Sequence, residues 1–411
     1  MRLLISLSAL LISIFFTQLG SGSLGPLDAL SGAAKGFSLQ DIGYLGSAHF
    51  AGFLLGCLVS AKMIMRVGHA RAFVAMATIA ILSALLHPMW FNAIFWMVLR
   101  FGTGFAVAGA YTVIESWLQA KLENSNRARV FSIYRLVDIS GTLVAQGMIA
   151  GLEPASYAAY NTVAIACCFC LLPLALTQSA PPALPEKLKV RPLMAFILSP
   201  LGATGVMVAG LTNSSFRMIG PIFADRLGFA QDAIALFLAL GILGGGIAQF
   251  PIAWLADSFD RRRVLMALSL FALAVCFALT SDFGLSSAFN VFVLIFLFGA
   301  ATIPIYSISA SHAHDFSTPV QSVELSASLI FIYALGAIIS PALTGWLMTG
   351  YGPNAMFAFI AVAHFGLLVF GLWRTTRRPT HETRAPYRYL PRTSLFVGQF
   401  LRRKRQNGKS S

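Results

Sequence analysis

The chain has 411 residues, of which 57% are hydrophobic and 11% are charged. An ordinary soluble domain is roughly a quarter charged, so this composition excludes a water-soluble protein and predicts a membrane protein. Twelve segments of about 20 residues would use most of the length, which excludes a large extramembrane enzyme domain. The net charge of +14 would suggest nucleic acid as a partner for a soluble protein, so its meaning depends on where the charge lies.

Apolar runs of about 20 residues, bounded by charge or by Pro and Gly, predict twelve membrane-spanning helices. In the first half we expect them at 3–24, 42–65, 72–90, 92–118, 130–151 and 157–177. In the second half we expect them at 197–217, 231–256, 263–280, 287–310, 320–349 and 354–374. A secretory signal peptide is the alternative for the first run. Its apolar stretch is longer than a signal core, and its removal would leave an odd number of spans.

The basic residues predict the orientation of these spans. With a cytoplasmic N-terminus, most of the 29 Lys and Arg residues fall in inside segments. Only Lys35, Arg217 and Arg226 fall in outside segments, and Arg100 lies within the membrane. This asymmetry fits the positive-inside rule and predicts a bacterial inner-membrane protein with both termini in the cytoplasm. The tail run RRKR at 402–405 then favours contact with membrane lipids over nucleic acid.

The sequence shows no cofactor or metal motif. The glycine-rich run GILGGG at 241–246 has no Lys-Ser/Thr pair of a phosphate loop, so we expect no nucleotide site. The cluster CCFC at 167–170 has no His or carboxylate partner on its own helix, and we interpret it as packing residues. We expect no disulfide framework, because all five cysteines lie in predicted helices.

The chain divides into two similar halves. We expect a six-helix bundle at 1–177, a cytoplasmic linker at 178–194, a second bundle at 195–374 and a basic tail at 375–411. A shift of 195 residues superposes three pairs, which are Gly104 and Gly299, Tyr111 and Tyr306, and Gly141 and Gly336. A shift of 192 superposes 61–71 on 253–263. Parallel six-helix repeats are typical of transporters whose halves move about a central site.

Three motifs carry a resemblance to the major facilitator superfamily over residues 1–374. The segment LADSFDRRR at 255–263 resembles the loop signature G-x-L-A-D-R-x-G-R-R, with Asp260 at its second glycine. The segment RFGTG at 100–104 resembles the R-x-x-x-G pattern of the fourth helix. IESW at 114–117 and PIYSISASHAHD at 304–315 resemble the YcaD-like transporters within it. The resemblance implies twelve helices in two pseudo-symmetric bundles.

Ionisable and polar residues at membrane depth are the candidates for proton coupling or substrate binding. Arg100 lies about 12 Å into the fourth helix, where the resemblance implies a role in proton transfer or anion binding. Arg135 and Asp138 share one helix face; burial opposes ionisation of Asp138 and Arg135 favours it, so the pair is a candidate proton site. His49 and Gln146 are further candidates. For each residue, helix packing is the alternative.

A second group of residues predicts a gate at the cytoplasmic side. In the first half, the resemblance implies that Glu115 forms a charge cluster with the 2–3 connection, where the loop signature is matched at Arg66, Gly68 and Arg71. Proton carriage or a plain ion pair are the alternatives for Glu115. In the second half we expect exchanging ion pairs among Asp257, Arg261, Arg262, Asp315 and Glu324. His312 and His314 point in opposite directions on a helix, so we expect no metal site there.

These features together predict a secondary transporter that moves a small solute by alternating access, coupled to protons, and that acts as a monomer. The alternatives of the same fold are a multidrug exporter and an uncoupled facilitator. A membrane-integral lipid-handling enzyme is the alternative from another class. It would need a nucleophilic or His/Asp/Glu constellation, for which the segment HAHD at 312–315 is the one faint candidate.

Overall fold

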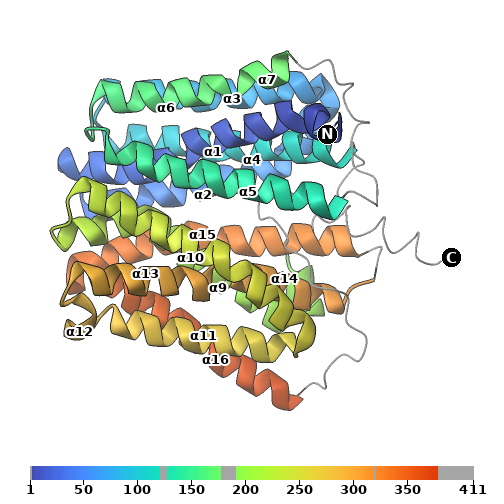
Figure 1. Cartoon of the computed structure of the whole chain (residues 1–411), viewed down its shortest axis with the longest axis vertical. Coiled ribbons are helices and arrows are strands. Elements are labelled where there is room, and N and C mark those ends of the chain that lie inside the picture. The colour runs from blue at the N-terminus through green and yellow to red at the C-terminus, as the bar shows by residue number, and fades with distance from the viewer. Residues whose placement is uncertain (1, 121–126, 177–190, 319–320, 378–411) are drawn as a thin grey trace. The chain divides into compact units, whose positions relative to one another are not determined.

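The structure is a computed structural model, and it describes residues 2–120, 127–176, 191–318 and 321–377. The described residues form helices joined by short connections and contain no strand (Figure 1). This confirms the predicted all-α class. The expected linker at 178–194 lies largely outside the described residues, and the tail run at 402–405 lies wholly outside them.

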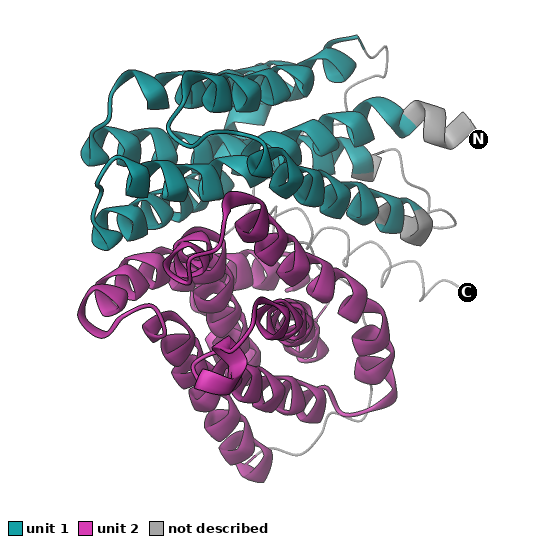
Figure 2. Cartoon of the chain, turned by 60° about the vertical axis from the view of Figure 1, so that its left-hand side comes forward, with its two compact units in different colours: residues 1–188, 393–396 teal, residues 189–392, 397–411 magenta. Residues whose placement is uncertain are grey.

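The helices fall into two compact units, which we call the N-terminal unit and the C-terminal unit (Figure 2). The N-terminal unit holds α1 Arg2–Ala34, α2 Leu39–Val67, α3 His69–Leu86, η1 His87–Met89, α4 Ala93–Ala120, α5 Arg127–Ala150, α6 Tyr157–Phe169 and α7 Leu171–Ala175. The C-terminal unit holds α8 Met194–Leu198, α9 Pro200–Arg226, α10 Gln231–Ser258, α11 Arg261–Ala278, α12 Asp282–Leu285, α13 Ala288–Thr302, α14 Ile305–Asp315, α15 Ser322–Tyr351 and α16 Ala355–Arg377.

Each of the twelve expected spans coincides with one helix or with two consecutive helices. In the described part of the chain, nine segments are long and apolar enough to cross a membrane. The remaining expected spans correspond to α5, α9 and α11, which carry charged residues such as Asp138, Arg217 and Arg261. Large apolar side chains such as Phe277 and Phe289 are about three-quarters exposed, as expected for a surface that faces lipid.

The end of the first helix was predicted wrongly. Gly25 and Pro26 follow several small residues, a pattern that normally ends a helix, yet α1 continues for ten residues beyond 24. The extra turns are buried, and Ser31 accepts a hydrogen bond from the backbone of Ala155 at 2.7 Å. The extension carries Asp28 into the bundle.

Glycines set the closest helix contacts, and they do so in equivalent places in both units. A Cβ on Gly104 would lie 1.8 Å from the carbonyl oxygen of His49, where α4 crosses α2. A Cβ on Gly299 would lie 1.8 Å from the carbonyl oxygen of Gly241, where α13 crosses α10. Gly141 approaches α1 and Gly336 approaches α9 in the same way. Two of the sequence pairs that define the internal repeat therefore make matching backbone contacts.

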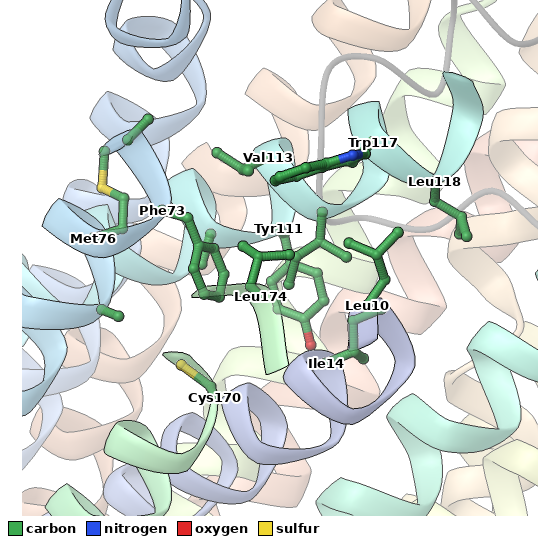
Figure 3. Packing of buried hydrophobic residues seen from close by; sticks show 14 of the residues in the cluster. Leu10, Ile14, Phe73, Met76, Tyr111, Val113, Trp117, Leu118, Cys170 and Leu174 are labelled. Atoms are coloured by element: carbon green, nitrogen blue, oxygen red, sulfur yellow. The ribbon is translucent and has the colours of Figure 1, made fainter. Parts of the chain in front are cut away.

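An apolar cluster fills the end of the N-terminal unit at which the chain starts. It joins Leu10 and Ile14 of α1 to Phe73 and Met76 of α3 and to Trp117 of α4 (Figure 3). The ring of Tyr111 lies inside this cluster, with its hydroxyl beside α1 (Figure 3). The polar groups described below lie around and beyond this apolar layer.

Candidate functional site

A buried carboxylate, Asp28, lies at the centre of the strongest polar cluster in the N-terminal unit. Its side chain is fully buried and lies 3.4 Å from both His87 Nε2 and Arg100 Nη1. The Tyr160 hydroxyl donates a hydrogen bond of 2.9 Å to Asp28 Oδ1. Four helical segments, α1, η1, α4 and α6, each supply one of these groups. We call these four residues the Asp28 cluster.

The position of one proton follows from the contacts of His87. Its Nδ1 lies 2.6 Å from the carbonyl oxygen of Ser83, and a carbonyl can only accept, so Nδ1 carries a hydrogen. Nε2 faces Asp28 Oδ2, and neither of these two atoms has a hydrogen bond in the structure. A favourable contact between them requires one proton, on Nε2 or on the carboxyl. The two side chains are therefore placed so that one exchangeable proton can pass between them.

Local packing fixes the geometry of the Asp28 cluster. The His87 ring stacks on Tyr160 with centroids 5.3 Å apart. The fully buried Trp96 donates its indole hydrogen to the carbonyl oxygens of His87 and Trp90. Gly25 leaves room for the arginine, since a Cβ there would lie 3.7 Å from Arg100 Nη2. Ring contacts and a glycine thus hold the charged groups against one another.

A small cavity continues from Arg100 into the N-terminal unit. Its volume is about 30 Å³, enough for about two water molecules and far below the size of a solute pocket. Its polar lining consists of Thr17, Ser21, His49, Arg100 and Thr103. On α4 the lining residues run from Arg100 to Ala110, about 15 Å along the helix. The cavity ends against the apolar layer that contains Tyr111.

Asp138 lies beyond that layer, in a second polar cluster. Arg135 pairs with Asp138 Oδ2, and the Tyr111 hydroxyl donates to Asp138 Oδ1 at 2.7 Å. The pairing of Arg135 with Asp138 is the one expected from their spacing. Asp138 is buried, while the Arg135 side chain is about one quarter exposed. The arginine thus joins this buried carboxylate to the surface of the unit.

His49 and Gln146, the two neutral candidates, contact neighbouring helices. His49 Nδ1 lies 3.3 Å from the Thr103 hydroxyl, at the wall of the cavity. Gln146 donates to the carbonyl oxygens of Gly22 and Thr142 at 3.4 and 3.3 Å. His49 adjoins Arg100 through the cavity, whereas Gln146 bonds across α5 and α1 as a packing residue does.

Glu115 does not have the partners expected for it. It is fully buried and accepts a hydrogen bond of 2.8 Å from the Tyr134 hydroxyl of α5. Arg66 and Arg71 are exposed, and no ion pair joins either of them to Glu115 in the described residues. The reason is that α4 turns Glu115 towards α5, into the bundle, and away from the α2–α3 connection. Gly68 forms that connection with φ +83°, a conformation that favours glycine.

The charges of the C-terminal unit are brought together only in part. Arg261 lies 2.6 Å from Asp315 and 3.5 Å from Asp257, so one arginine joins α10, α11 and α14. Arg262 instead pairs with Asp260 at 2.9 Å, and Glu324 lies 3.7 Å from Arg191. The expected five-member exchange cluster is thus one triad and two separate pairs. Asp260, which replaces the glycine of the loop signature, accounts for the diversion of Arg262.

The two histidines of α14 also have separate surroundings. His314 Nε2 lies 3.1 Å from the Ser326 hydroxyl, and its Nδ1 lies 3.4 Å from Ser317. His312 contacts the ring of Phe316 edge to face. The segment HAHD therefore joins α14 to α15 and packs within the unit.

Sequence reasoning found Arg100 but missed the other members of its cluster. Asp28 was placed in a connection, because the glycine, proline and serine residues before it were interpreted as the end of a helix. The available signal was its apolar context, with Leu27 before it and Ala29 and Leu30 after it. His87 and Tyr160 are 59 and 132 residues away from Asp28 in sequence and carry no local sign of their shared role.

A fold of many long apolar helices in two repeated units, with ionisable groups buried inside it, is typical of membrane transport proteins. The sequence profile of the Major Facilitator Superfamily matches residues 10–203 and 202–406, and the chain belongs to this family. This match confirms the resemblance and the predicted fold. The proteins of this family are transporters and not enzymes, as predicted. The protein is a multi-pass membrane transporter.

Relatives and solved structures agree. An uncharacterized MFS-type transporter of Enterobacter sp. (strain 638) is 26% identical over 90% of this chain and 96% of its own. The uncharacterized MFS-type transporter YcaD of Escherichia coli is 24% identical over the same shares. A mutant of the nucleoside transporter NupG has a TM-score of 0.76 at 14% identity, over 91% of this chain and 100% of its own. The D-xylose-proton symporter has a TM-score of 0.72 at 15% identity, over 92% and 98%.

Proposed function

We propose that the protein is a proton-coupled secondary transporter of a small solute in the bacterial inner membrane, with both termini in the cytoplasm. It works by alternating access, in which the two six-helix units move against each other. The energy comes from the proton gradient. The observation that carries the proposal is the buried Asp28–His87 pair, whose facing oxygen and nitrogen lie 3.4 Å apart beside the Arg100 guanidinium.

Opposed influences on Asp28 supply the coupling. Burial favours the neutral carboxyl, whereas Arg100 and His87 favour the carboxylate. A movement of α4 relative to α1 changes the distance between Arg100 and Asp28 and so changes the balance. With the N-terminus in the cytoplasm, the Asp28 cluster lies towards the outer face, where it takes up its proton. Asp138 and Glu115 lie towards the inner face of the N-terminal unit, away from the Asp28 cluster.

The test uses the full chain reconstituted in proteoliposomes that contain a pH-sensitive dye. Nucleosides and xylose, the cargoes named for proteins of the same fold, are tested together with amino acids and organic acids. We expect at least one solute to drive proton movement in the wild type. Asp28→Asn should abolish this movement, and Asp225→Asn, a matched change at an exposed aspartate of α9, should preserve it.

The outcomes separate the alternatives of the same fold. Solute flux without proton movement in the wild type would identify an uncoupled facilitator. Intact proton movement in Asp28→Asn would place the coupling elsewhere, with Asp138 as the next residue to change. A folded wild-type protein that moves none of these solutes would contradict the proposal.

A further inference from the structure

One arginine of the C-terminal unit, Arg217, is set apart by its position on α9. It lies 17 residues after Pro200 and nine residues before Arg226, so about 14 Å of helix separates it from the nearer end. The charge pattern of the sequence places Arg217 in an outside segment, but α9 continues for nine residues beyond it. A charged side chain inside a membrane-crossing helix is costly unless a cavity or a partner accommodates it.

The exposure of α9 changes locally at this residue. Arg217 is exposed and Asn213, one turn before it, is half-buried. Val206 lies seven residues before Asn213 and Ala224 lies seven residues after Arg217, both on the same helix face. Both of these residues are fully buried. The stretch at Asn213 and Arg217 is therefore an exposed interruption of an otherwise covered helix face.

Arg217 also differs from the buried arginines of the helices, and from Arg135, in having no acidic partner. Arg100, Arg135, Arg261 and Arg262 each lie within 4 Å of a carboxylate. In the part of the chain that the structure describes, no carboxylate lies within that distance of Arg217, and no other polar interaction of its side chain is present. The charge of this one side chain is therefore available to a ligand.

The internal repeat relates Arg217 to the Asp28 cluster. The backbone contacts of Gly141 on Phe15 and of Gly336 on Met207 align α1 with α9 at a shift of 192 residues. Arg217 then corresponds to Gly25, beside which Arg100 lies in the N-terminal unit. Gly220 corresponds to Asp28. The C-terminal unit thus has a cation, Arg217, near the position that Arg100 occupies in the N-terminal unit, and has no carboxylate at the position equivalent to Asp28.

The backbone next to Arg217 adds an acceptor. Pro221 has no N–H to give to the carbonyl oxygen of Arg217, four residues before it. The site therefore offers a guanidinium fork, which matches the two oxygens of a carboxylate, and a carbonyl without its helical donor.

We infer that Arg217 binds the carboxylate of the transported solute, which makes small organic acids the substrate class. The solute supplies to Arg217 the negative charge that Asp28 supplies to Arg100. This inference rests on the proposed transport function, and it names the solute for the same protein.

The test compares organic acids with their own amides, which differ in charge and little in shape. Benzoate with benzamide, lactate with lactamide, and glutamate with glutamine are added to the purified full-length protein, and the melting temperature is measured. A ligand of the native state raises it by mass action. We expect at least one acid to act at a concentration at least about tenfold lower than its amide, as for a charge-assisted bond.

The variants locate the effect. Arg217→Gln should weaken the acid response at least about tenfold, and Arg217→Lys, which keeps the charge but not the fork, should retain part of it. Arg226→Gln removes an exposed arginine at the end of the same helix and should leave the response unchanged. An unchanged response in Arg217→Gln, an equal response to acids and amides, or no response to any acid would overturn the inference and leave Arg217 as a residue that reaches the lipid headgroups.

The same proteins separate this inference from the proposed function. Proton movement driven only by neutral solutes, and lost in Asp28→Asn, would support coupling and overturn the role of Arg217. Acid binding that is lost in Arg217→Gln, in a wild type without proton movement, would support the role of Arg217 and contradict the coupling.

Discussion

The two units share a packing pattern and differ in what they bury. In the N-terminal unit three carboxylates, Asp28, Glu115 and Asp138, lie inside the helix bundle. In the C-terminal unit the buried acid–base pairs lie at the end of the bundle, around Arg261. The matching glycine contacts show that small residues specify the repeat, and that ionisable side chains can be added to one copy without changing it.

The difference is systematic when equivalent positions are compared. At the shifts of 195 and 192 residues, Arg100 corresponds to Ile295, and His87 corresponds to Leu279. Asp138 corresponds to Tyr333, so the hydrogen-bonded pair of Tyr111 with Asp138 becomes an edge-to-face contact of Tyr306 with Tyr333. The N-terminal unit thus carries ionisable side chains at these positions, and the C-terminal unit has Ile295, Leu279 and Tyr333 in their places.

Hydroxyl groups are the buried polar groups between α9 and α15. Ser215 lies 2.5 Å from the Ser340 hydroxyl and 2.7 Å from the Thr344 hydroxyl. Such neutral bonds join membrane helices without trapping a charge. They stabilise the unit and have no proton to exchange near neutral pH.

The largest expected difference is between His87 and His364, a fully buried histidine from each unit. His87→Gln removes the proton shared with Asp28 and should lower proton-coupled flux at least about 100-fold, as removal of a positioned proton-transfer group does. His364 contacts only the Thr212 hydroxyl, at 3.1 Å, among described side chains. His364→Gln should cost about 1–3 kcal/mol of stability and preserve flux per folded protein. The flux and the melting temperature of both variants test this prediction. Equal losses of flux in the two variants would contradict a special role for His87.

Glycine contacts should respond alike in both units. Gly104→Ala and Gly299→Ala each place a Cβ 1.8 Å from a backbone oxygen of the facing helix, and overpacking of this kind costs about 1–3 kcal/mol or more. Gly147→Ala and Gly366→Ala are matched controls, because nothing lies within 4 Å of a Cβ at either position. We expect lower melting temperatures for the first pair only. A loss in one unit alone would contradict a shared packing pattern.

The pair of Asp138 and Tyr333 sharpens the comparison at the other end of the bundle. Asp138→Asn leaves Arg135 without its charged partner and should lower flux about tenfold, the effect of one charged hydrogen bond. Proton coupling should persist, because Asp28 is intact. Tyr333→Phe removes a hydroxyl at the equivalent position and should change flux less than Asp138→Asn. Flux assays with simultaneous dye and solute readout decide between these outcomes. Loss of coupling in Asp138→Asn, with coupling kept in Asp28→Asn, would reverse the roles of the two carboxylates.

The sequence predicts the fold well and the site partly, for different physical reasons. Apolar runs long enough to cross a membrane are local signals, so the positions of the twelve helical segments follow from composition. Arg100 and Asp138 are detectable because a charge stands within such a run. The partners of Asp28 come from three other helical segments and meet it only through tertiary packing. Glu115 shows a second limit of sequence-based prediction. Its position on α4 could be predicted, but the neighbouring helix that its side chain faces could not.

The smallest expected effect concerns Tyr160, which completes the Asp28 cluster without a charge of its own. Tyr160→Phe keeps the ring that stacks on His87 and removes only the hydrogen bond to Asp28 Oδ1, 2.9 Å long. That bond favours the ionised carboxylate over the neutral acid. Its removal should weaken this preference by about 1 kcal/mol, so the pH at which coupled flux is half-maximal should rise by somewhat less than about one unit.

The direction of that shift separates chemistry from packing. A bond that held only the ring in place would change the maximal rate and leave the pH profile where it was. The measurement is coupled flux between about pH 5 and 9 for the wild type and Tyr160→Phe. Tyr134→Phe is the matched control, because it removes another buried tyrosine hydroxyl, the one that donates a hydrogen bond to Glu115. Because Glu115 lies outside the Asp28 cluster, Tyr134→Phe should alter the rate alone. A profile that moves equally in both variants would mean that the proton-binding function of the N-terminal unit is spread over both carboxylates.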